Sequence, residues 1–268
     1  MPSSAVVVIP VYQPSLSAQE LAVLGRIAAV LGRHPIVFVL PQGLDAAPYL
    51  ASIPTASAQP FAPHYFAGVA GYNRLMLAPE FYAAFTDYDY LLIHQLDALV
   101  FRDDLLEWCA RGYDYIGAPW AKYWSFWPAA LRWPVKQWRG ALARRMTLSD
   151  TSKWLRHRVA GQVGNGGLSL RRVQTFRQVL AESSPLLDHY RERGGDHYNE
   201  DVFWSLAARH QGRPLKIPGF DEALRFSIEH FPEQSMRRIG GLPFGCHAWE
   251  LFLDEWQPVF ARLGLALP

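Results

Sequence analysis

The first forty residues contain two short apolar runs with a helical pattern between them. Residues 6–11 and 36–40 carry no charge and are rich in Val, Ile and Leu, which is typical of strands buried on both faces of a sheet. Between the runs, apolar residues recur at helical spacing from Leu21 to Leu31 after Ser17, a residue type that caps helices. Because parallel strands need a long crossover connection, this order predicts an α/β protein with a parallel, nucleotide-type sheet.

The rest of the chain continues the alternation of strands and helices. Five prolines between residues 41 and 64 predict a surface connection with little regular structure. A helix-like segment is expected at 72–85, in which Pro79 starts, kinks or ends a turn. Strands are expected at 90–93 and 113–120, and a glycine-rich turn leads into a strand at 163–171. Helices are expected at 103–111, at 172–182 and from about 199, and a compact turn at 243–249. We therefore expect one α/β domain spanning residues 1–268.

Composition bounds the class of protein. The chain has 268 residues, of which 50% are hydrophobic, so it can bury a large core. Its two cysteines, Cys109 and Cys246, are too few for a disulfide scaffold and lack the spacing of a zinc site, which favours a reducing cytoplasm. The apolar run at 6–11 is too short for a signal sequence, and no run is long enough to span a bilayer. A cytoplasmic protein is expected.

Residues 121–160 interrupt this pattern with a basic, tryptophan-rich segment. It contains nine Lys or Arg residues, one acidic residue and five of the ten tryptophans, so its net charge is +8 against −6 for the remainder. We interpret it as an inserted, mostly helical segment that makes peripheral contact with an anionic membrane at its inner face, or with a lipid-linked acceptor. The alternative is a solvated helical face whose tryptophans pack on the main domain. Nucleic acid is not an expected partner, because no recognition motif accompanies the charge.

A lone carboxylate follows the strand at 90–93. Asp97 lies just beyond this strand, and a buried Asp there would need a partner. In open α/β sheets, ligands bind outside the carboxyl ends of the strands. Asp97 is therefore a candidate ligand-binding residue. The alternative, that it caps the following helix, is served better by Asp103 and Asp104.

Three further features each allow a structural and a functional interpretation. The glycines of residues 163–167 could form a tight turn with positive φ, or could let backbone N–H groups approach a ligand. They form neither a P-loop nor a dinucleotide fingerprint, because no Gly-Lys-Ser/Thr is present and a strand follows. Glu200 and Asp201 could be an acid pair favoured by a helix dipole, or could include a catalytic group. His247 could be a core imidazole or a ligand.

Taken in order, these motifs resemble those of the GT-A glycosyltransferases, nucleotide-sugar-dependent enzymes of α/β fold. The matching segments are Gln95-Leu96-Asp97, Asn165-Gly166-Gly167, Asn199-Glu200-Asp201 and His247, and Ile9-Pro10-Val11-Tyr12 is similar to the first nucleotide-binding strand of such enzymes. More narrowly, segments such as Gln-Leu-Asp-Ala-Leu-Val-Phe and Asn-Glu-Asp-Val-Phe-Trp look like a largely bacterial GT-A-like family. The resemblance covers nearly the whole chain except the insert. It implies a Rossmann-like, mixed, mostly parallel sheet flanked by helices, with a basic helical insert.

The resemblance also implies a function and a set of site residues. The implied protein is a metal-dependent, hexosyltransferase-like enzyme that moves a sugar from a nucleotide-sugar donor to an acceptor hydroxyl with inversion, in the synthesis of surface polysaccharide or glycoconjugate. Asp201 would be the catalytic base, and Asp97 and His247 would hold Mn²⁺ or Mg²⁺. Donor-binding residues would be Pro10, Val11, Tyr12, Asn73, Arg74, Gln95, Asn165, Gly166 and Gly167. A glycan or lipid-linked acceptor would contact Glu200, Trp120 and Trp249.

One departure from the family pattern keeps alternatives open. Gln95 stands where the first Asp of Asp-x-Asp is usual, which removes one charge from the metal site, although an amide can still contact a ribose. A catalytically silent sugar-nucleotide-binding protein is one alternative. A nucleotidyltransferase is another, although Gln13-Pro14-Ser15 stands where a glycine-rich, basic pyrophosphate loop would be needed. Retention at the anomeric carbon also remains open, because motif order does not fix the geometry of attack.

Overall fold

The structure is a computed structural model that describes residues 4–127, 159–182, 185–192, 198–208, 215–265 and 267. Most of the predicted basic insert, 121–160, lies outside the described residues, as do the helical structure and membrane contact expected of it. Its described beginning contains one 3₁₀ turn, η2 (Tyr123–Phe126). Within the described part of the chain, no helix is both long and apolar enough to cross a membrane.

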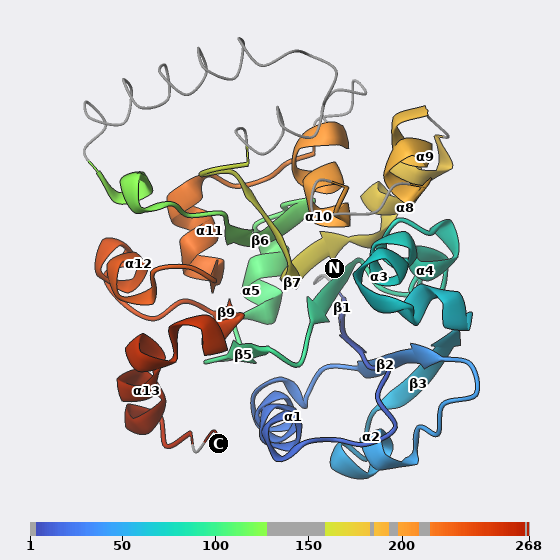
Figure 1. The fold of residues 1–268 in the computed structure, drawn as a ribbon, viewed down its shortest axis with the longest axis horizontal. Coiled ribbons are helices and arrows are strands. Elements are labelled where there is room, and N and C mark those ends of the chain that lie inside the picture. The colour runs from blue at the N-terminus through green and yellow to red at the C-terminus, as the bar shows by residue number, and fades with distance from the viewer. Residues whose placement is uncertain are drawn as a thin grey trace.

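A six-stranded sheet forms the centre of the structure (Figure 1), with strand order β3-β2-β1-β4-β7-β6. Strands β1 to β4 pair in parallel, whereas β7 runs antiparallel to both of its neighbours. The predicted mixed, mostly parallel sheet is therefore confirmed. Its strands are β1 (Ala5–Pro10), β2 (Ile36–Pro41), β3 (Ser57–Phe61), β4 (Tyr90–His94), β6 (Tyr115–Pro119) and β7 (Val163–Arg172).

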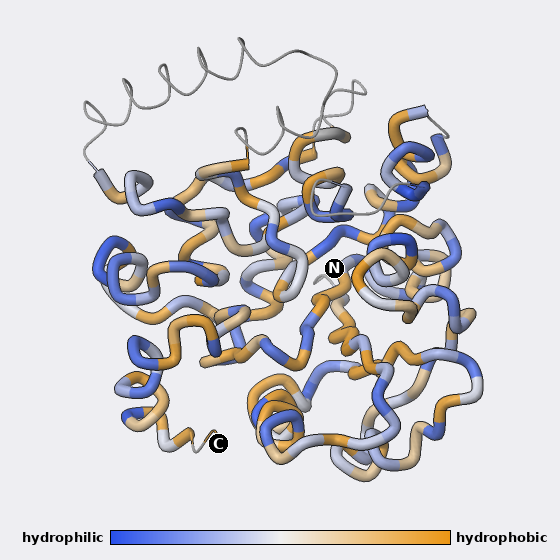
Figure 2. The backbone as a smooth tube through the Cα atoms, viewed as in Figure 1, coloured by the Kyte–Doolittle hydropathy of each residue, from blue (hydrophilic) through white to orange (hydrophobic). Residues whose placement is uncertain are grey.

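Alternate residues of the central strands enter two different apolar clusters. In β1, Val7 and Ile9 belong to one cluster and Val6 and Val8 to the other, and none of the four is exposed. Burial on both faces explains why this strand is a nearly continuous apolar run. Figure 2 shows apolar residues along the central strands, with polar and apolar residues mixed on the surrounding helices.

Helices cover both faces of the sheet. The cluster of Val7 includes residues of α1 (Ala18–Leu31), α2 (Ala47–Ser52), α5 (Leu105–Ala110), α11 (Phe220–Phe226), α12 (Pro232–Ile239) and α13 (Leu253–Arg262). The cluster of Val6 includes residues of α3 (Gly68–Met76), α4 (Pro79–Ala83), α8 (Val173–Ala181), α9 (Pro185–Glu192), α10 (Glu200–Val202) and the π-helical turn η3 (Phe203–Ala207).

A second, three-stranded sheet lies beside the first, with strand order β5-β9-β8. Its strands are β5 (Ala98–Val100), β9 (Gly245–His247) and β8 (Ser227–Ile228). Strand β5 begins after only three residues, Gln95 to Asp97, beyond the end of β4. The small sheet is thus attached directly to the carboxyl end of a central strand of the large one.

Three sequence-based expectations about local structure are wrong. Residues 41–64 are not irregular, because they form α2, β3 and the start of the 3₁₀ turn η1 (Pro63–Phe66). Pro60 is tolerated in β3 because β3 is an edge strand. The glycines of residues 163–167 lie within β7 rather than in a turn. His247 ends strand β9, and the turn follows it.

Candidate active site

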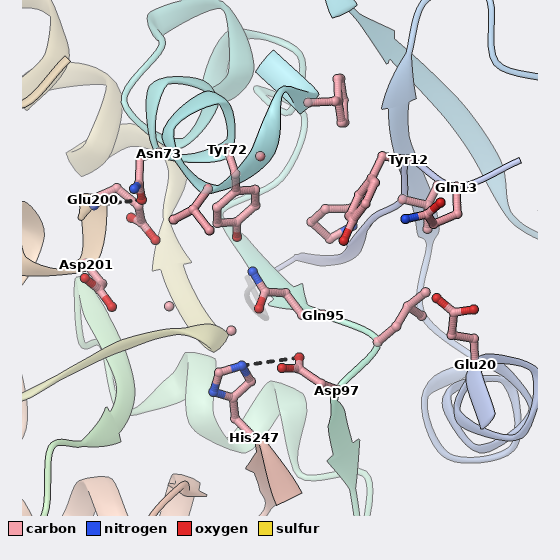
Figure 3. A pocket seen from close by; sticks show the side chains of 18 of the residues that line it. Tyr12, Gln13, Glu20, Tyr72, Asn73, Gln95, Asp97, Glu200, Asp201 and His247 are labelled. Atoms are coloured by element: carbon pink, nitrogen blue, oxygen red, sulfur yellow. Dashed lines mark hydrogen bonds and ion pairs between the residues drawn. The ribbon is translucent and has the colours of Figure 1, made fainter. Parts of the chain in front are cut away.

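A cavity of about 660 Å³ lies at the carboxyl ends of β1 and β4 (Figure 3). Strand β1 lies between β2 and β4, so the chain crosses to opposite sides of β1 when it forms these two strands. In open α/β sheets this reversal of strand order is where ligands bind. The cavity also has a volume in the range of small-molecule sites.

The cavity brings together most of the residues that the sequence singled out. Those that line it are Pro10, Val11, Tyr12, Asn73, Gln95, Asp97, Asn165, Gly166, Gly167, Glu200, Asp201 and His247. They come from segments up to 237 positions apart, as with Pro10 and His247. Figure 3 shows Gln95 between Tyr72 and the pair formed by Asp97 and His247, with Asp201 on the opposite side of the cavity from Tyr12.

Three predicted residues do not line the cavity. Arg74 lies on α3 beside Asn73 but outside the lining. Trp249 is buried in the apolar core, edge-on to Phe260, and cannot contact an acceptor there. Trp120 packs against the apolar cluster of Val6. The structure therefore gives these three side chains no place in the described cavity.

The small sheet places three polar side chains in a row, which we call the polar row: Asp97, His247 and Glu229. Asp97 immediately precedes β5, whose first residue pairs with His247 on β9. Ile228 at the end of β8 pairs with Cys246, so Glu229, the residue after β8, lies beside His247. In this row, His247 Nε2 lies 3.3 Å from Asp97 Oδ1. On the other side of the ring, His247 Nδ1 lies 3.7 Å from Glu229 Oε1.

Charges within the polar row stabilise one another. Burial alone would lower the pKa of His247, but the carboxylates of Asp97 and Glu229 raise it to about 10. Burial would raise the pKa of Glu229, but His230 and His247 lower it to about 2. Burial likewise acts to raise the pKa of Asp97, yet His247 holds it below its usual value. Without a metal these groups hold His247 as a cation between two carboxylates, and a metal ion bound at Nε2 would displace the proton from that nitrogen.

The backbone turns sharply just beyond the polar row. Among the described residues, only Phe231 (φ 53°) and Ala248 (φ 48°) have positive φ without being glycine. They lie two residues after Glu229 and one residue after His247, respectively. Left-handed backbone is unfavourable for such residues and persists where the surrounding structure imposes it, often at functional sites.

Two members of the polar row, Asp97 and His247, have the atoms that a divalent cation requires. Asp97 Oδ1 and His247 Nε2 are buried and have no hydrogen-bond partner, although their separation makes them an ion pair. A carboxylate and an imidazole together suit Mn²⁺. No three His, Cys, Asp or Glu side chains of the described residues converge as a metal-ligand group. The two residues thus fit a cation that takes its remaining ligands from phosphate and water, as Mg²⁺ usually does.

The acid pair of α10, Glu200 and Asp201, forms another part of the cavity lining. Glu200 accepts two hydrogen bonds from Arg171, Nη2 to Oε1 at 2.8 Å and Nη1 to Oε2 at 3.0 Å. Arg171 is completely buried, and the Glu200 side chain is only 2% exposed. Asn73 fixes the start of the helix, because its Oδ1 accepts a hydrogen bond from the Glu200 N–H and its Nδ2 donates to Asn199. Glu200 is therefore already neutralised by a protein partner.

Among the described residues, no Lys or Arg forms an ion pair with Asp201, and the charge of Arg171 makes only the smallest of the contributions to its pKa. Burial, followed by the neighbouring charge of Glu200, raises the pKa of Asp201 to about 8. Its Oδ1 accepts one hydrogen bond, from the Val202 N–H at 2.7 Å. A carboxylate that lines a cavity with a pKa close to neutral is suited to accept a proton.

The glycines of β7 are required by side chains from distant segments. A Cβ on Gly167 would lie 2.0 Å from His247 Nε2, and one on Gly166 would lie 2.4 Å from Glu200 Oε1. Neither glycine has positive φ, so the expectation of a tight turn there is wrong. Asn165 links this strand to the polar row, because its Nδ2 donates to Glu229 Oε1 at 2.7 Å and its Oδ1 accepts from the Gly167 N–H.

Other lining residues were not identified from the sequence. The carboxylates of Glu20 and Glu250 line the cavity, and Gln19 on α1 donates a hydrogen bond to Glu250 beyond β9. No Lys or Arg is among the described lining residues. Five aromatic residues also line the cavity: Tyr12, Tyr49, Tyr65, Phe66 and Tyr72. Arg171 could have been suspected from sequence, because a lone charge within an apolar strand needs a partner. Glu229 follows a two-residue strand and had no such signal.

Comparison with known proteins supports this fold. A sequence profile of the family described as "Protein of unknown function (DUF5672)" matches residues 55–247. No curated protein matches the chain by sequence. Among solved structures, the chain is similar to the galactosyltransferase LgtC in complex with donor and acceptor sugar analogs, with a TM-score of 0.56 and 15% identity over 96% of this chain and 94% of LgtC.

Two further structures give the same result. Mouse xyloside xylosyltransferase 1 aligns with a TM-score of 0.50 and 13% identity, over 92% of this chain and 98% of that protein. The bifunctional glycosyltransferase WbbM aligns with a TM-score of 0.52 and 13% identity, over 92% of this chain but 46% of WbbM. At these identities the likeness establishes the fold. The chain has the fold of the GT-A glycosyltransferases, which confirms the fold expected from its motifs.

Proposed function

The chain belongs to the DUF5672 family, and we propose that it is a metal-dependent glycosyltransferase that moves a sugar from a nucleotide-sugar donor to an acceptor hydroxyl. The observation that carries this proposal is the meeting of the separate motifs in one cavity at the carboxyl ends of β1 and β4. The polar row, the acid pair and the aromatic lining residues together suit a ligand with a diphosphate, a sugar and a base.

Asp97 and His247 are the residues that would hold Mn²⁺ or Mg²⁺. When bound, the cation would neutralise the charge that develops on the departing diphosphate. The described lining contains carboxylates but no Lys or Arg, so a diphosphate needs a cation to offset its charge there. Tyr12, Asn73, Gln95 and the strand from Asn165 to Gly167 are the proposed donor-binding residues.

Asp201 is the proposed catalytic base. The acceptor oxygen would form a bond to the anomeric carbon while the bond from that carbon to the diphosphate breaks, and the hydroxyl proton would pass to Asp201. Its pKa of about 8 makes it a stronger base than an ordinary carboxylate. Attack opposite the leaving group inverts the anomeric configuration. Glu200 supports this assignment, because its own carboxylate is held by Arg171.

The acceptor and the cellular location complete the proposal. We expect a glycan or lipid-linked acceptor in surface polysaccharide or glycoconjugate synthesis, and a cytoplasmic protein that contacts anionic membrane through residues 121–160. Co-sedimentation with anionic liposomes at low and high salt tests the membrane contact, since surface cations contribute roughly 1 kcal/mol each near anionic lipid. Absence of binding at low salt would reject it.

The central experiment is a donor-consumption assay with a panel of nucleotide sugars, with and without Mn²⁺. We expect one donor to be hydrolysed or transferred only when the cation is present, and NMR of the product to show the anomeric configuration opposite to that of the donor. Binding of a nucleotide sugar without turnover would instead indicate a binding protein. A product of retained configuration would remove the base role from Asp201.

A further inference from the structure

Glu229 occupies a position in the site that no motif identifies. It is 8% exposed and follows the two-residue strand β8, so its carboxylate lies at the end of the small sheet beside His247. The carboxylate of Asp97 lies beside Nε2 of the His247 ring, and the carboxylate of Glu229 lies on the Nδ1 side. The two carboxylates therefore face opposite nitrogens of one imidazole.

Glu229 also contacts the glycine segment and its own neighbour. Its Oε1 accepts a hydrogen bond from Asn165 Nδ2 at 2.7 Å, and the same Asn165 holds the Gly167 N–H. Its Oε2 lies 3.2 Å from His230 Nδ1. One buried carboxylate thus contacts three groups, of which His247 and Asn165 line the cavity.

We propose that Glu229 is a positioning residue that orients the His247 imidazole toward a divalent cation and couples that orientation to the strand from Asn165 to Gly167. A histidine that binds a metal through one nitrogen commonly donates its other ring N–H to a carboxylate, which fixes the tautomer and the ring plane. Glu229 Oε1 faces Nδ1 at 3.7 Å and would accept from it after a small approach, which leaves Nε2 on the side of Asp97. This inference rests on the proposed metal-dependent function.

The local backbone supports a positioning role rather than ligation. Parallel pairing of β8 with β9 sets Glu229 beside His247, and positive φ at Phe231 and Ala248 turns both strands away directly afterwards. Such strain is maintained only where the surrounding structure imposes it. Glu229 does not complete a three-residue ligand group with Asp97 and His247 among the described residues.

The test is the affinity of the protein for Mn²⁺ alone, measured from the loss of the free-ion EPR signal on titration. Glu229→Leu is expected to raise the dissociation constant about 10- to 100-fold, the usual effect of removing a carboxylate that orients a ligating histidine. Glu229→Gln retains an acceptor for Asn165 and should fold if the leucine variant does not. We expect about a tenfold increase for it, at the low end of the same range.

Three controls separate positioning from other effects. Glu233→Gln removes an exposed carboxylate four residues away and should leave the Mn²⁺ affinity unchanged. In a His247→Ala background, Glu229→Gln should weaken Mn²⁺ binding no further, because Glu229 acts through that ring. Unfolding midpoints of all variants show whether the fold is retained.

The outcomes distinguish this inference from the proposed function. If Asp97→Asn weakens Mn²⁺ binding while both Glu229 variants bind like the parent, the positioning role is overturned and the metal site stands. If the parent protein does not bind Mn²⁺, or if Asp97→Asn has no effect, the metal site itself fails and the role of Glu229 fails with it.

Discussion

The acid pair of α10 and the polar row of the small sheet hold carboxylates at the same cavity in different ways. Glu200 is held by a buried arginine from the large sheet, with two hydrogen bonds and no exposed surface on Arg171. Asp97 is held by strand register beside His247, is 43% exposed at its side chain, and keeps a buried oxygen without a hydrogen-bond partner. One wall has its charge satisfied by protein, and the other does not.

This difference indicates which wall is built to receive a charged ligand. A buried carboxylate with a bidentate arginine gains little from a further cation, whereas an unsatisfied oxygen beside an imidazole gains ligation. Asp201 stands between these cases, because it shares α10 with Glu200 but has no cationic partner among its described contacts. The comparison predicts that Asp201 takes part in proton transfer, that Glu200 has a structural role and that Asp97 binds the ligand.

The largest expected effect is the loss of turnover when Asp201 is replaced. Asp201→Asn keeps the shape of the side chain and removes its basicity, so turnover should fall roughly 10²- to 10⁴-fold, as for other positioned bases. Donor affinity should stay near that of the parent, because the proton acceptor does not bind the donor. Steady-state kinetics and donor titration measure both quantities. Near-normal turnover would show that the base is elsewhere.

The second prediction concerns stability and contrasts the two walls directly. Arg171→Met leaves Glu200 buried without its partner, which should lower the free energy of unfolding by about 3–5 kcal/mol. Asp97→Asn removes a partly exposed charge and should change it by less than about 1 kcal/mol. Urea denaturation followed by fluorescence provides both values. If both variants lose the same free energy of unfolding, Asp97 contributes to stability as much as the Arg171–Glu200 pair does.

The third prediction tests the packing between β7 and the polar row. Gly167→Ala places a methyl group 2.0 Å from His247 Nε2, so the ring must move. We expect a loss of stability of about 1–3 kcal/mol, as for other overpacked sites, together with weaker Mn²⁺ binding. The matched control is Gly219→Ala, where nothing lies within 4 Å of the added atom. If Gly167→Ala binds Mn²⁺ like the control, His247 does not depend on this contact.

The fourth prediction concerns the pH profile. Because the pKa of Asp201 is raised to about 8, more of it is deprotonated as the pH rises, and turnover should increase through pH 8. Below that midpoint the rate should fall about tenfold per pH unit. A profile from pH 6 to 10 locates this rise, which should be absent from the residual activity of Asp201→Asn. A flat profile across this range would instead indicate an ordinary carboxylate, which is already deprotonated at pH 6.

Sequence reasoning identified the large sheet better than the small one. The strands β1, β2 and β4 are buried on both faces, so each can be recognised as a strand from its own apolar run. Strand β3 has the sequence Ser-Ala-Gln-Pro-Phe, and it exists because β2 supplies its hydrogen bonds. Strand β8 is only two residues long and depends on β9, so the position of Glu229 could not be read from its own segment.

The glycines illustrate the same limit within the site. The residues Gly166 and Gly167 were correctly singled out, but the reason for them lies in Glu200 and His247, which are 34 and 80 positions away in the chain. Arg171 and Glu200 were likewise visible as residues but not as partners. Residue types follow from local sequence, whereas their pairing follows from strand order and register.

The register of the small sheet also has a consequence for how the chain can change in length. Asp97, His247 and Glu229 face one another because each stands at the end of a neighbouring strand, and side chains alternate between the two faces of a strand. An insertion of one residue within β9 would turn the imidazole to the other face, even if every functional side chain were kept. Insertions between α12 and β9 leave the register intact. Related proteins that preserve this chemistry should therefore vary in loop length there but keep the strand ends free of gaps.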